Sequence, residues 1–239
     1  MGNQASVKNH MDNAQRTGVF TLSKMNITEV PKDITRIKDN IRSLDLSVNK
    51  LKAIPDSIGS FSNLKHVNLS DNKLHSIPES IGNLTKLETL HVCNNLLSSL
   101  PITLSKLNHL RILSLSGNAL TSFPLQIVGL KHLDVLDVSK NKMTEIPAGV
   151  ESLSVSELNL NQNQLSKISE SIALCPRLKV FRLQENCLPL TGIPSKLLSD
   201  SPVNLIAFEG NLFGDKDFQG LPGYELYLER FTASKKKLM

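Results

Sequence analysis

The sequence predicts an α/β solenoid, a curved stack of coils with parallel strands on the concave face and short helices or 3-10 turns on the convex face. Three observations predict it. The apolar spacing of residues 110–128 returns at a nearly constant period, an asparagine recurs at one place in each copy, and an apolar residue followed by proline comes next in most copies. A fixed period favours one continuous stacked array over separate globular domains.

The repeat reads L-x-x-L-x-L-x-x-N-x-L, as in Leu110, Leu113, Leu115, Asn118 and Leu120. Successive copies start 23, 23, 23, 23, 22, 23 and 25 residues apart, at Ile41, Leu64, Leu87, Leu110, Leu133, Val155, Leu178 and Val203. This pattern resembles the leucine-rich repeat family, in its short intracellular class whose second half reads I-P-x-x-I. The resemblance covers about residues 17–213.

Each copy contains a short strand and a turn. In Leu44-Asp45-Leu46 the leucines point inward and the aspartate outward, which is the period of a strand. An amide has both donors and acceptors, so we expect the recurring asparagines to pair with the peptide groups that each turn frees. They form a structural ladder of Asn49, Asn72, Asn95, Asn118, Asn141, Asn163, Asn186 and Asn211.

The convex side should consist of helical turns that begin at a proline, as in Ile54-Pro55, because Ile54, Ile58 and Phe61 have helical spacing. Helices need more room than strands, which predicts the curvature. Two copies depart from this rule. Ile168-Ser169 has no proline, and residues 188–194 carry extra residues that should make the convex segment bulge.

Both ends of the array need covers. We expect residues 1–16 to hold an N-capping helix, residues 17–213 one degenerate and eight regular repeats, and residues 214–231 a C-terminal cap. The remaining basic tail, residues 232–239, should be disordered. Its lysines are candidates for electrostatic contact with a membrane, and they are Lys235, Lys236 and Lys237.

The first residues match the N-myristoylation pattern, with Gly2 exposed after removal of Met1, then Asn3, and Ser6 at the sixth place. Gly2 is therefore a candidate lipidation site, with Asn3 and Ser6 as motif residues. A plainer interpretation is that Ser6 caps a short helix, which the spacing of Val7 and Met11 also supports. Both interpretations can hold together.

Composition excludes several classes of function. The net charge of +5 is mild, and no basic stripe with aromatics indicates nucleic-acid binding. No apolar run approaches 18 residues. The three cysteines, Cys93, Cys175 and Cys187, show no disulfide or metal spacing, so we expect a reducing compartment, no cofactor and no metal. Cys93 is a half-buried spectator or a reactive thiol.

The exposed strand positions form columns across neighbouring coils, with about 5 Å between adjacent members. His66 and His91 lie on neighbouring strands and could suggest a metal site. A solvated polar surface is favoured instead, because no third ligand is well placed. One column alternates in charge, which indicates either a ladder of exposed ion pairs or a docking patch on the concave face. The candidate protein-binding residues are Glu88, His91, Arg111, Asp134, Asp137 and Arg182.

No set of residues indicates catalysis, so we expect a non-enzymatic, monomeric scaffold or adaptor in intracellular signalling, with a protein partner on the concave face. Acylation of Gly2 would tether it to the cytoplasmic side of membranes, with some of it cytosolic. The alternative is a soluble regulatory subunit of a signalling enzyme such as a phosphatase, without an anchor. An enzyme is a third hypothesis, supported only by isolated His and Cys residues.

Overall fold

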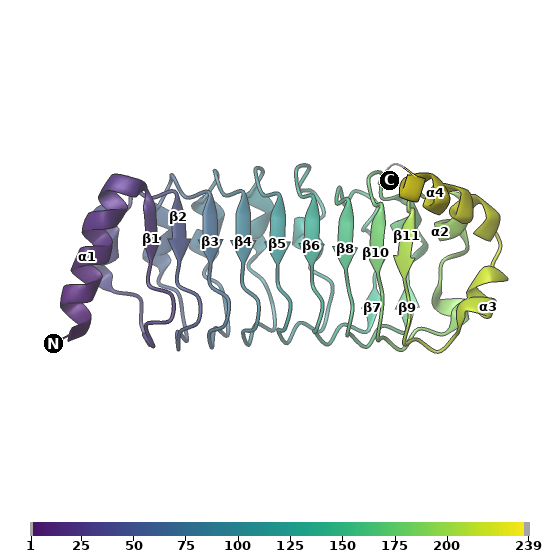
Figure 1. Ribbon diagram of the computed structural model, residues 1–239, viewed down its shortest axis with the longest axis horizontal. Helices are drawn as coiled ribbons and strands as arrows, with labels where there is room; N and C mark the ends of the chain where they lie inside the picture. Colours follow the sequence, from purple (N-terminus) through teal and green to yellow (C-terminus); the bar gives the residue numbers. More distant parts are fainter. Residues whose placement is uncertain (1, 237–239) are drawn as a thin grey trace. The chain divides into compact units, whose positions relative to one another are not determined.

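The computed structural model describes the backbone of residues 2–236 and the side chains of residues 7–236 (Figure 1). The chain divides after Ala119 into two compact units, which we call the N-terminal unit and the C-terminal unit. Each is built from stacked coils with strands on one side and short helices on the other. The predicted class, an α/β repeat solenoid, is confirmed within each unit.

The N-terminal unit begins with helix α1 (Gly2–Thr17), which is longer than the helix expected from the sequence. Its strands pair in parallel and in chain order. Among the described residues of this unit they are β1 (Val19–Thr21), β2 (Ser43–Asp45), β3 (His66–Asn68), β4 (Thr89–His91) and β5 (Ile112–Ser114).

The register of these strands stacks one apolar residue from each coil on the next. Phe20 pairs with Leu44, which pairs with Val67, followed by Leu90 and Leu113, and each is at most 1% exposed. Because strand side chains alternate, the first and third residues of each strand point outward. A single row of aliphatic contacts thus orders the outward-facing surface of the same strands.

The other side of the N-terminal unit consists of short 3-10 helices, each preceded by a proline. They are η1 (Lys32–Ile37), η2 (Asp56–Ser60), η3 (Glu79–Asn83) and η4 (Ile102–Lys106), after Pro31, Pro55, Pro78 and Pro101. Proline suits this place because it lacks an N–H and fixes φ. Gly82 lets two helices approach closely, since a Cβ there would lie 2.6 Å from the Thr103 carbonyl oxygen.

In the C-terminal unit the strands again run in parallel. The main row within the described chain is β6 (Val135–Asp137), β8 (Glu157–Asn159), β10 (Val180–Arg182) and β11 (Leu205–Ala207). A second pair, β7 (Glu145–Ile146) with β9 (Lys167–Ile168), forms its own small sheet. The sequence predicted a helical turn after Ile146-Pro147, but this coil forms β7 and then continues through a bend.

The helical side of the C-terminal unit follows the two sequence irregularities. It comprises η5 (Leu125–Ile127), η6 (Glu170–Leu174), η7 (Leu190–Gly192) and α2 (Ser195–Ser199). Ser169 replaces the missing proline, because its hydroxyl accepts the N–H of Ser171 at 3.3 Å and so begins η6. The extra residues before Pro194 form η7, and the α-helix α2 follows.

The C-terminal cap consists of α3 (Asp215–Gln219) and α4 (Tyr224–Lys236) and includes a cluster of aromatic rings, in which Phe208 stacks on Phe218 and Tyr227 meets Phe218 edge-on. The Tyr227 hydroxyl accepts the N–H of Ile206 in β11 at 3.1 Å. The expectation that the tail is disordered is wrong for residues 232–236, which continue α4. Lys237 lies outside the described residues.

No helix in the described part of the chain combines the length and the apolar character needed to span a bilayer.

Candidate binding surfaces: the strand face and the N-terminal groove

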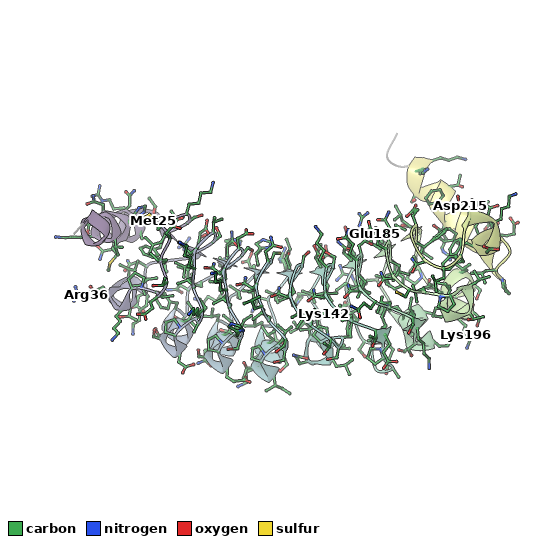
Figure 2. The ribbon with its side chains drawn as sticks, turned by 90° about the horizontal axis from the view of Figure 1, so that it is seen from below. Met25, Arg36, Lys142, Glu185, Lys196 and Asp215 are labelled. Carbon is green, nitrogen blue, oxygen red and sulfur yellow. The ribbon has the colours of Figure 1, made fainter. Side chains whose placement is uncertain are left out.

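The strand face of each unit is the surface formed by the outward-pointing strand residues and by the residue before each strand. Figure 2 shows, in the C-terminal unit, that Glu185 lies on the strand side while Lys196 lies on the helical side with α2. Each unit carries three of the six predicted binding residues. Glu88, His91 and Arg111 belong to the N-terminal unit, and Asp134, Asp137 and Arg182 to the C-terminal unit.

In the N-terminal unit, Glu88 directly precedes β4 and Arg111 directly precedes β5. The Lys65 ammonium lies 2.7 Å from the Glu88 carboxylate. The hydrogen bond from Lys65 lowers the pKa of Glu88, and the charges of Lys65 and Arg111 lower it further. Partial desolvation of the carboxylate opposes this shift. Glu88 is therefore one partner of the predicted ion-pair ladder, with Lys65 from the preceding coil.

His91 is half-buried at the end of β4, opposite Asn68 of β3. Desolvation lowers the pKa of His91, and the nearby charge of His66 lowers it further. The ring is therefore neutral at pH 7. Among the residues that the structure describes, no group of three metal-ligating side chains comes together, so the two histidines form part of a polar surface.

In the C-terminal unit, both Asp134 and Arg182 have ionic partners that the sequence did not indicate. The Arg177 guanidinium lies 2.8 Å from the Asp134 carboxylate, although the two residues are 43 positions apart. Arg182 donates to Glu157 at 2.9 Å, a residue at the outward-facing start of β8. All four side chains are at least 34% exposed, so each pair is a weak surface ion pair.

Asp137 has a structural contact that the sequence analysis missed. Its carboxylate accepts the N–H of Ser139 at 2.9 Å and so closes the turn that ends β6. Asp45 does the same for Ser47 at 2.9 Å. The recurrence of Asp or Asn at this third strand position could have indicated the turn, because such side chains bond their own backbone two residues on.

The asparagine ladder lies directly behind the strand face. Asn95 is typical, because its amide nitrogen donates to the carbonyls of Val92 and Cys93 in its own coil and of Leu69 in the preceding coil. Its amide oxygen accepts the N–H of Leu74 at 3.0 Å. In the degenerate first coil Met25 takes the place of the asparagine, and Asn49 of the next coil accepts its N–H at 3.1 Å.

The three cysteines lie in different surroundings. Cys175 is buried, its thiol donates to the carbonyl of Val150 at 3.1 Å, and desolvation raises its pKa to about 12. Cys93 is partly buried beyond the end of β4, and Cys187 is exposed. A thiolate is the reactive form of cysteine, so Cys175 is unreactive at neutral pH.

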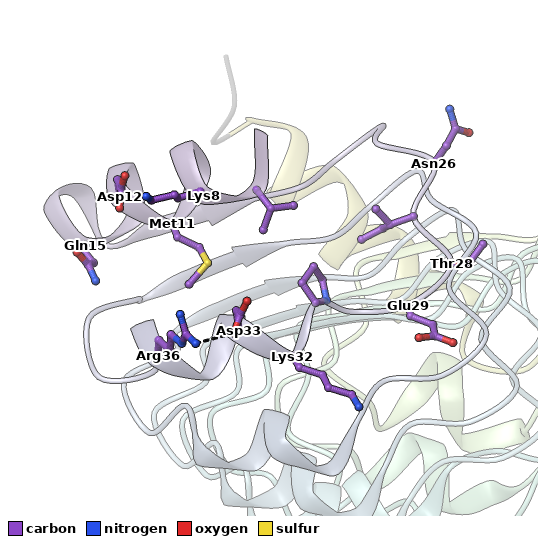
Figure 3. Close-up of a pocket in the computed structure, with 13 residues that line it drawn as sticks. Lys8, Met11, Asp12, Gln15, Asn26, Thr28, Glu29, Lys32, Asp33 and Arg36 are labelled. Atoms are coloured by element: carbon purple, nitrogen blue, oxygen red, sulfur yellow. Dashed lines mark ion pairs between the residues drawn. The ribbon is translucent and has the colours of Figure 1, made fainter. Parts of the chain in front are cut away.

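A groove of about 810 Å³ lies between α1 and η1 in the N-terminal unit (Figure 3). Met11 projects from α1 toward η1, and half-buried Val7 lines the same groove one turn earlier. Charged side chains form the rim, including the Arg36–Asp33 ion pair at 3.2 Å. Sequence reasoning assigned Val7 and Met11 only to helix packing and did not find this groove.

A second groove of about 720 Å³ adjoins the first, sharing Thr28, Glu29, Pro31 and Lys32 with it. Its lining is more apolar and includes Val30, Ala53 and Pro55 from the loops before η1 and η2. The two grooves therefore make a continuous depression at the N-terminal end of this unit.

The candidate membrane-contact residues lie at the two ends of the chain. The backbone of Gly2, Asn3 and Ser6 belongs to α1, while their side chains lie outside the described set. At the other end, the Lys235 ammonium lies 4.4 Å from the centre of the Phe231 ring, and Lys236 is the last residue of α4. Lys235 is thus held on the cap by a cation–π contact.

Comparison with known proteins gives consistent similarities. The family model described as leucine rich repeat matches residues 39–97, 62–120 and 85–143. An Arabidopsis thaliana protein with LRR repeats and a ubiquitin-like domain is 36% identical over 56 residues, which are 23% of this chain and 15% of that protein. The present chain thus matches a small part of that relative.

Solved structures extend the similarity over most of the chain. A leucine-rich repeat protein of Leptospira interrogans has a TM-score of 0.76 and 28% identity, covering 94% of this chain and 61% of that one. A plant peptide hormone receptor in complex with RGF2 has a TM-score of 0.55 and 26% identity, covering 77% of this chain and 38% of the receptor. An internalin of Listeria monocytogenes has a TM-score of 0.61 and 23% identity, and the match covers 84% of this chain and 56% of the internalin. At this identity it shows the fold alone.

Residues 39–143 are therefore leucine-rich repeats, and the repeated sequence pattern, the stacked coils within each unit and the similar solved structures support the leucine-rich repeat family for the chain.

Proposed function

We propose that this chain is a non-enzymatic protein-binding scaffold that holds its partner on the strand face. The observation that carries this proposal is a row of outward-facing charged and polar side chains, fixed at about 5 Å spacing by parallel strands and not needed for the core. Exposed Arg111 and half-buried His91 in the N-terminal unit, and Arg182 in the C-terminal unit, present donors there. The similar plant receptor was solved with a bound peptide, which supports a polypeptide ligand.

Proximity labelling in cells with charge-reversed variants would test the strand face. Arg111→Glu and Arg182→Glu change the strand face of each unit, while Lys106→Glu on η4 and Lys196→Glu on α2 make the same change on the helical side. We expect the strand-face variants to lose a common subset of labelled proteins that the helical-side variants keep. Equal losses in all four variants would exclude the strand face as the binding surface.

We propose further that a fatty acyl chain on Gly2 tethers the scaffold to the cytoplasmic side of a membrane, where it serves as a signalling adaptor. The supporting observation is the Met-Gly-Asn start with Ser6. The Gly2 amine would attack the carbonyl carbon of an acyl thioester, an amide would form, and the thiol carrier and a proton would leave. Intact mass of the cellular protein, compared with Gly2→Ala, tests this step directly.

A single myristoyl chain binds a bilayer with a partition constant of only about 10⁴ M⁻¹, so stable attachment needs a second contribution. The terminal lysines Lys235, Lys236 and Lys237 could supply about 1 kcal/mol each at an anionic surface. We expect acylated protein to sediment with anionic vesicles better than with zwitterionic ones, and the triple Lys→Ala variant to lose that difference. Equal sedimentation of the acylated protein with anionic and zwitterionic vesicles would exclude the lysine contribution.

A further inference from the structure

The groove between α1 and η1 contains a partly covered apolar patch within a lining that also includes polar and charged side chains. Val7 and Met11 of α1 and Pro31 before η1 line it while remaining only half-buried, and Ile27 closes its base at 7% exposed. By contrast Ala14, one turn beyond Met11, is completely buried against the rest of the unit. The apolar face of α1 is thus covered at its C-terminal end and open toward its N-terminal end.

The open part of α1 leads directly to the proposed lipidation site. Helix α1 begins at Gly2, and its axis advances about 1.5 Å per residue, so Met11 lies roughly 14 Å along the helix from the Gly2 nitrogen. A fully staggered chain of fourteen carbons extends roughly 16 Å, given carbon–carbon bonds of about 1.5 Å. An acyl chain that folds back from Gly2 along α1 is therefore long enough to pass Val7 and to end at Met11 on the groove lining.

Charged side chains lie at the edge of the groove. Lys8, Asp12, Asp33 and Arg36 surround the apolar floor, so the methylenes can enter the groove while the charged groups stay in water (Figure 3). Each methylene removed from water contributes about 0.8 kcal/mol, which makes the groove a competitor of the bilayer for the same chain.

We propose that this groove binds the acyl chain attached to Gly2 of the same molecule and so controls how much of the lipid is available to a membrane. The proposal rests on the proposed acylation of Gly2. Groove-bound and membrane-bound states exclude each other, because one acyl chain occupies either site. A bound protein partner or a membrane that displaces the chain from the groove thereby converts a cytosolic form into an anchored form.

Methyl NMR would test the groove directly. Protein labelled at methionine Cε is prepared with and without the acyl group, acylation is verified by intact mass, and the Met11 signal is assigned from Met11→Leu. We expect the Met11 methyl to shift on acylation and to show nuclear Overhauser contacts to acyl methylenes, while Met143, which is buried in the C-terminal unit, stays unchanged. Confirmed acylation with an unshifted Met11 methyl would overturn the groove and leave the anchor proposal intact.

Vesicle binding supplies a second measurement. If the groove holds the chain in at least nine of ten molecules, the partition constant on zwitterionic vesicles falls at least about tenfold below the 10⁴ M⁻¹ of a free myristoyl chain. Met11→Glu places a carboxylate on the groove floor and should restore about 10⁴ M⁻¹. Asn9→Glu adds the same charge to an exposed position of α1 away from the groove and should behave as wild type.

The outcomes separate the two proposals. Equal partitioning of wild-type, Met11→Glu and Asn9→Glu proteins, each verified as acylated, would overturn the groove alone. Absence of the acyl group from the cellular protein would refute the membrane-anchor proposal, and the groove proposal with it, because the groove would then have no acyl chain to bind. A Met11 methyl that responds to free myristic acid as strongly in unacylated protein as it does to acylation would show a general lipid site and overturn the intramolecular assignment.

Discussion

Removal of one ladder amide should destabilise the whole N-terminal unit, and Asn95→Ala is the sharpest version of this test. Asn95 is 6% exposed and makes four hydrogen bonds, from Nδ2 to the carbonyls of Leu69, Val92 and Cys93 and from the N–H of Leu74 to Oδ1. Alanine removes all four at once. The four lost bonds do not cost the same.

Each of the three carbonyls keeps a second donor after the substitution. These donors are the Asn72 amide for Leu69, the Asn118 amide for Val92 and the Asp71 N–H for Cys93. The Leu74 N–H has only Asn95 as its acceptor in the described structure, and a buried donor left alone costs about 1–3 kcal/mol. With a smaller loss at the three carbonyls, we expect unfolding free energy to fall by about 3 kcal/mol.

Urea denaturation followed by circular dichroism measures this loss, with the slope checked because repeat proteins can unfold in parts. Asn83→Ala is the matched control, since Asn83 is exposed on η3 and the same change there should stay within about 0.5 kcal/mol. If both variants lost less than about 1 kcal/mol, the ladder would not bear the stability that its hydrogen bonds imply.

Four further predictions concern other sites. Val48 has φ of 55° and is exposed at a turn position that carries Asp71, Asn94 and Gly117 in the next three coils, so Val48→Asn should raise the melting temperature by relieving about 1 kcal/mol of strain. Tyr227→Phe leaves the Ile206 N–H without its acceptor and should cost about 1–3 kcal/mol in urea denaturation. Iodoacetamide at pH 8 should modify exposed Cys187 before Cys175, as followed by mass spectrometry, because the Cys175 thiol is buried and its pKa is raised to about 12. Since folding raises that pKa from 9.0 to about 12, the stability that Cys175 contributes should be complete below pH 9.0 and lost as pH rises toward about 12.

The sequence was sufficient to predict the content of each coil. Alternation around Leu44 and the recurring asparagines specify which atoms face the core, because every coil repeats the same backbone path. The prolines likewise predict the starts of the 3-10 helices η2 to η4, where a missing N–H carries no penalty. These features are local, so one coil contains the information for its own geometry.

Contacts between coils were less predictable. Arg177 contacts Asp134 from 43 residues away, and no column of equivalent positions contains both residues. The extension of α4 through Lys235 was also not predicted, although Lys235 there contacts the Phe231 ring four residues earlier in the same helix. The β7–β9 pair depends on two neighbouring coils whose helical sides depart from the common pattern. A period specifies positions within a coil, while side-chain length and local departures decide which coils meet.

The turn contacts also determine which outward-facing residues can bind a partner without disturbing the turn. Asp137 already bonds the Ser139 N–H, so a substitution there disturbs the coil as well as the surface. His91 occupies the equivalent place in β4, yet the N–H two residues on, that of Cys93, bonds the Ser70 hydroxyl at 3.2 Å. The His91 side chain is therefore not needed to close the turn, whereas Asp137 and Asp45 close the equivalent turns of their own coils. If the strand face binds a partner as proposed, the surface around β4 is therefore the first one to examine, because substitutions at His91 leave the turn intact.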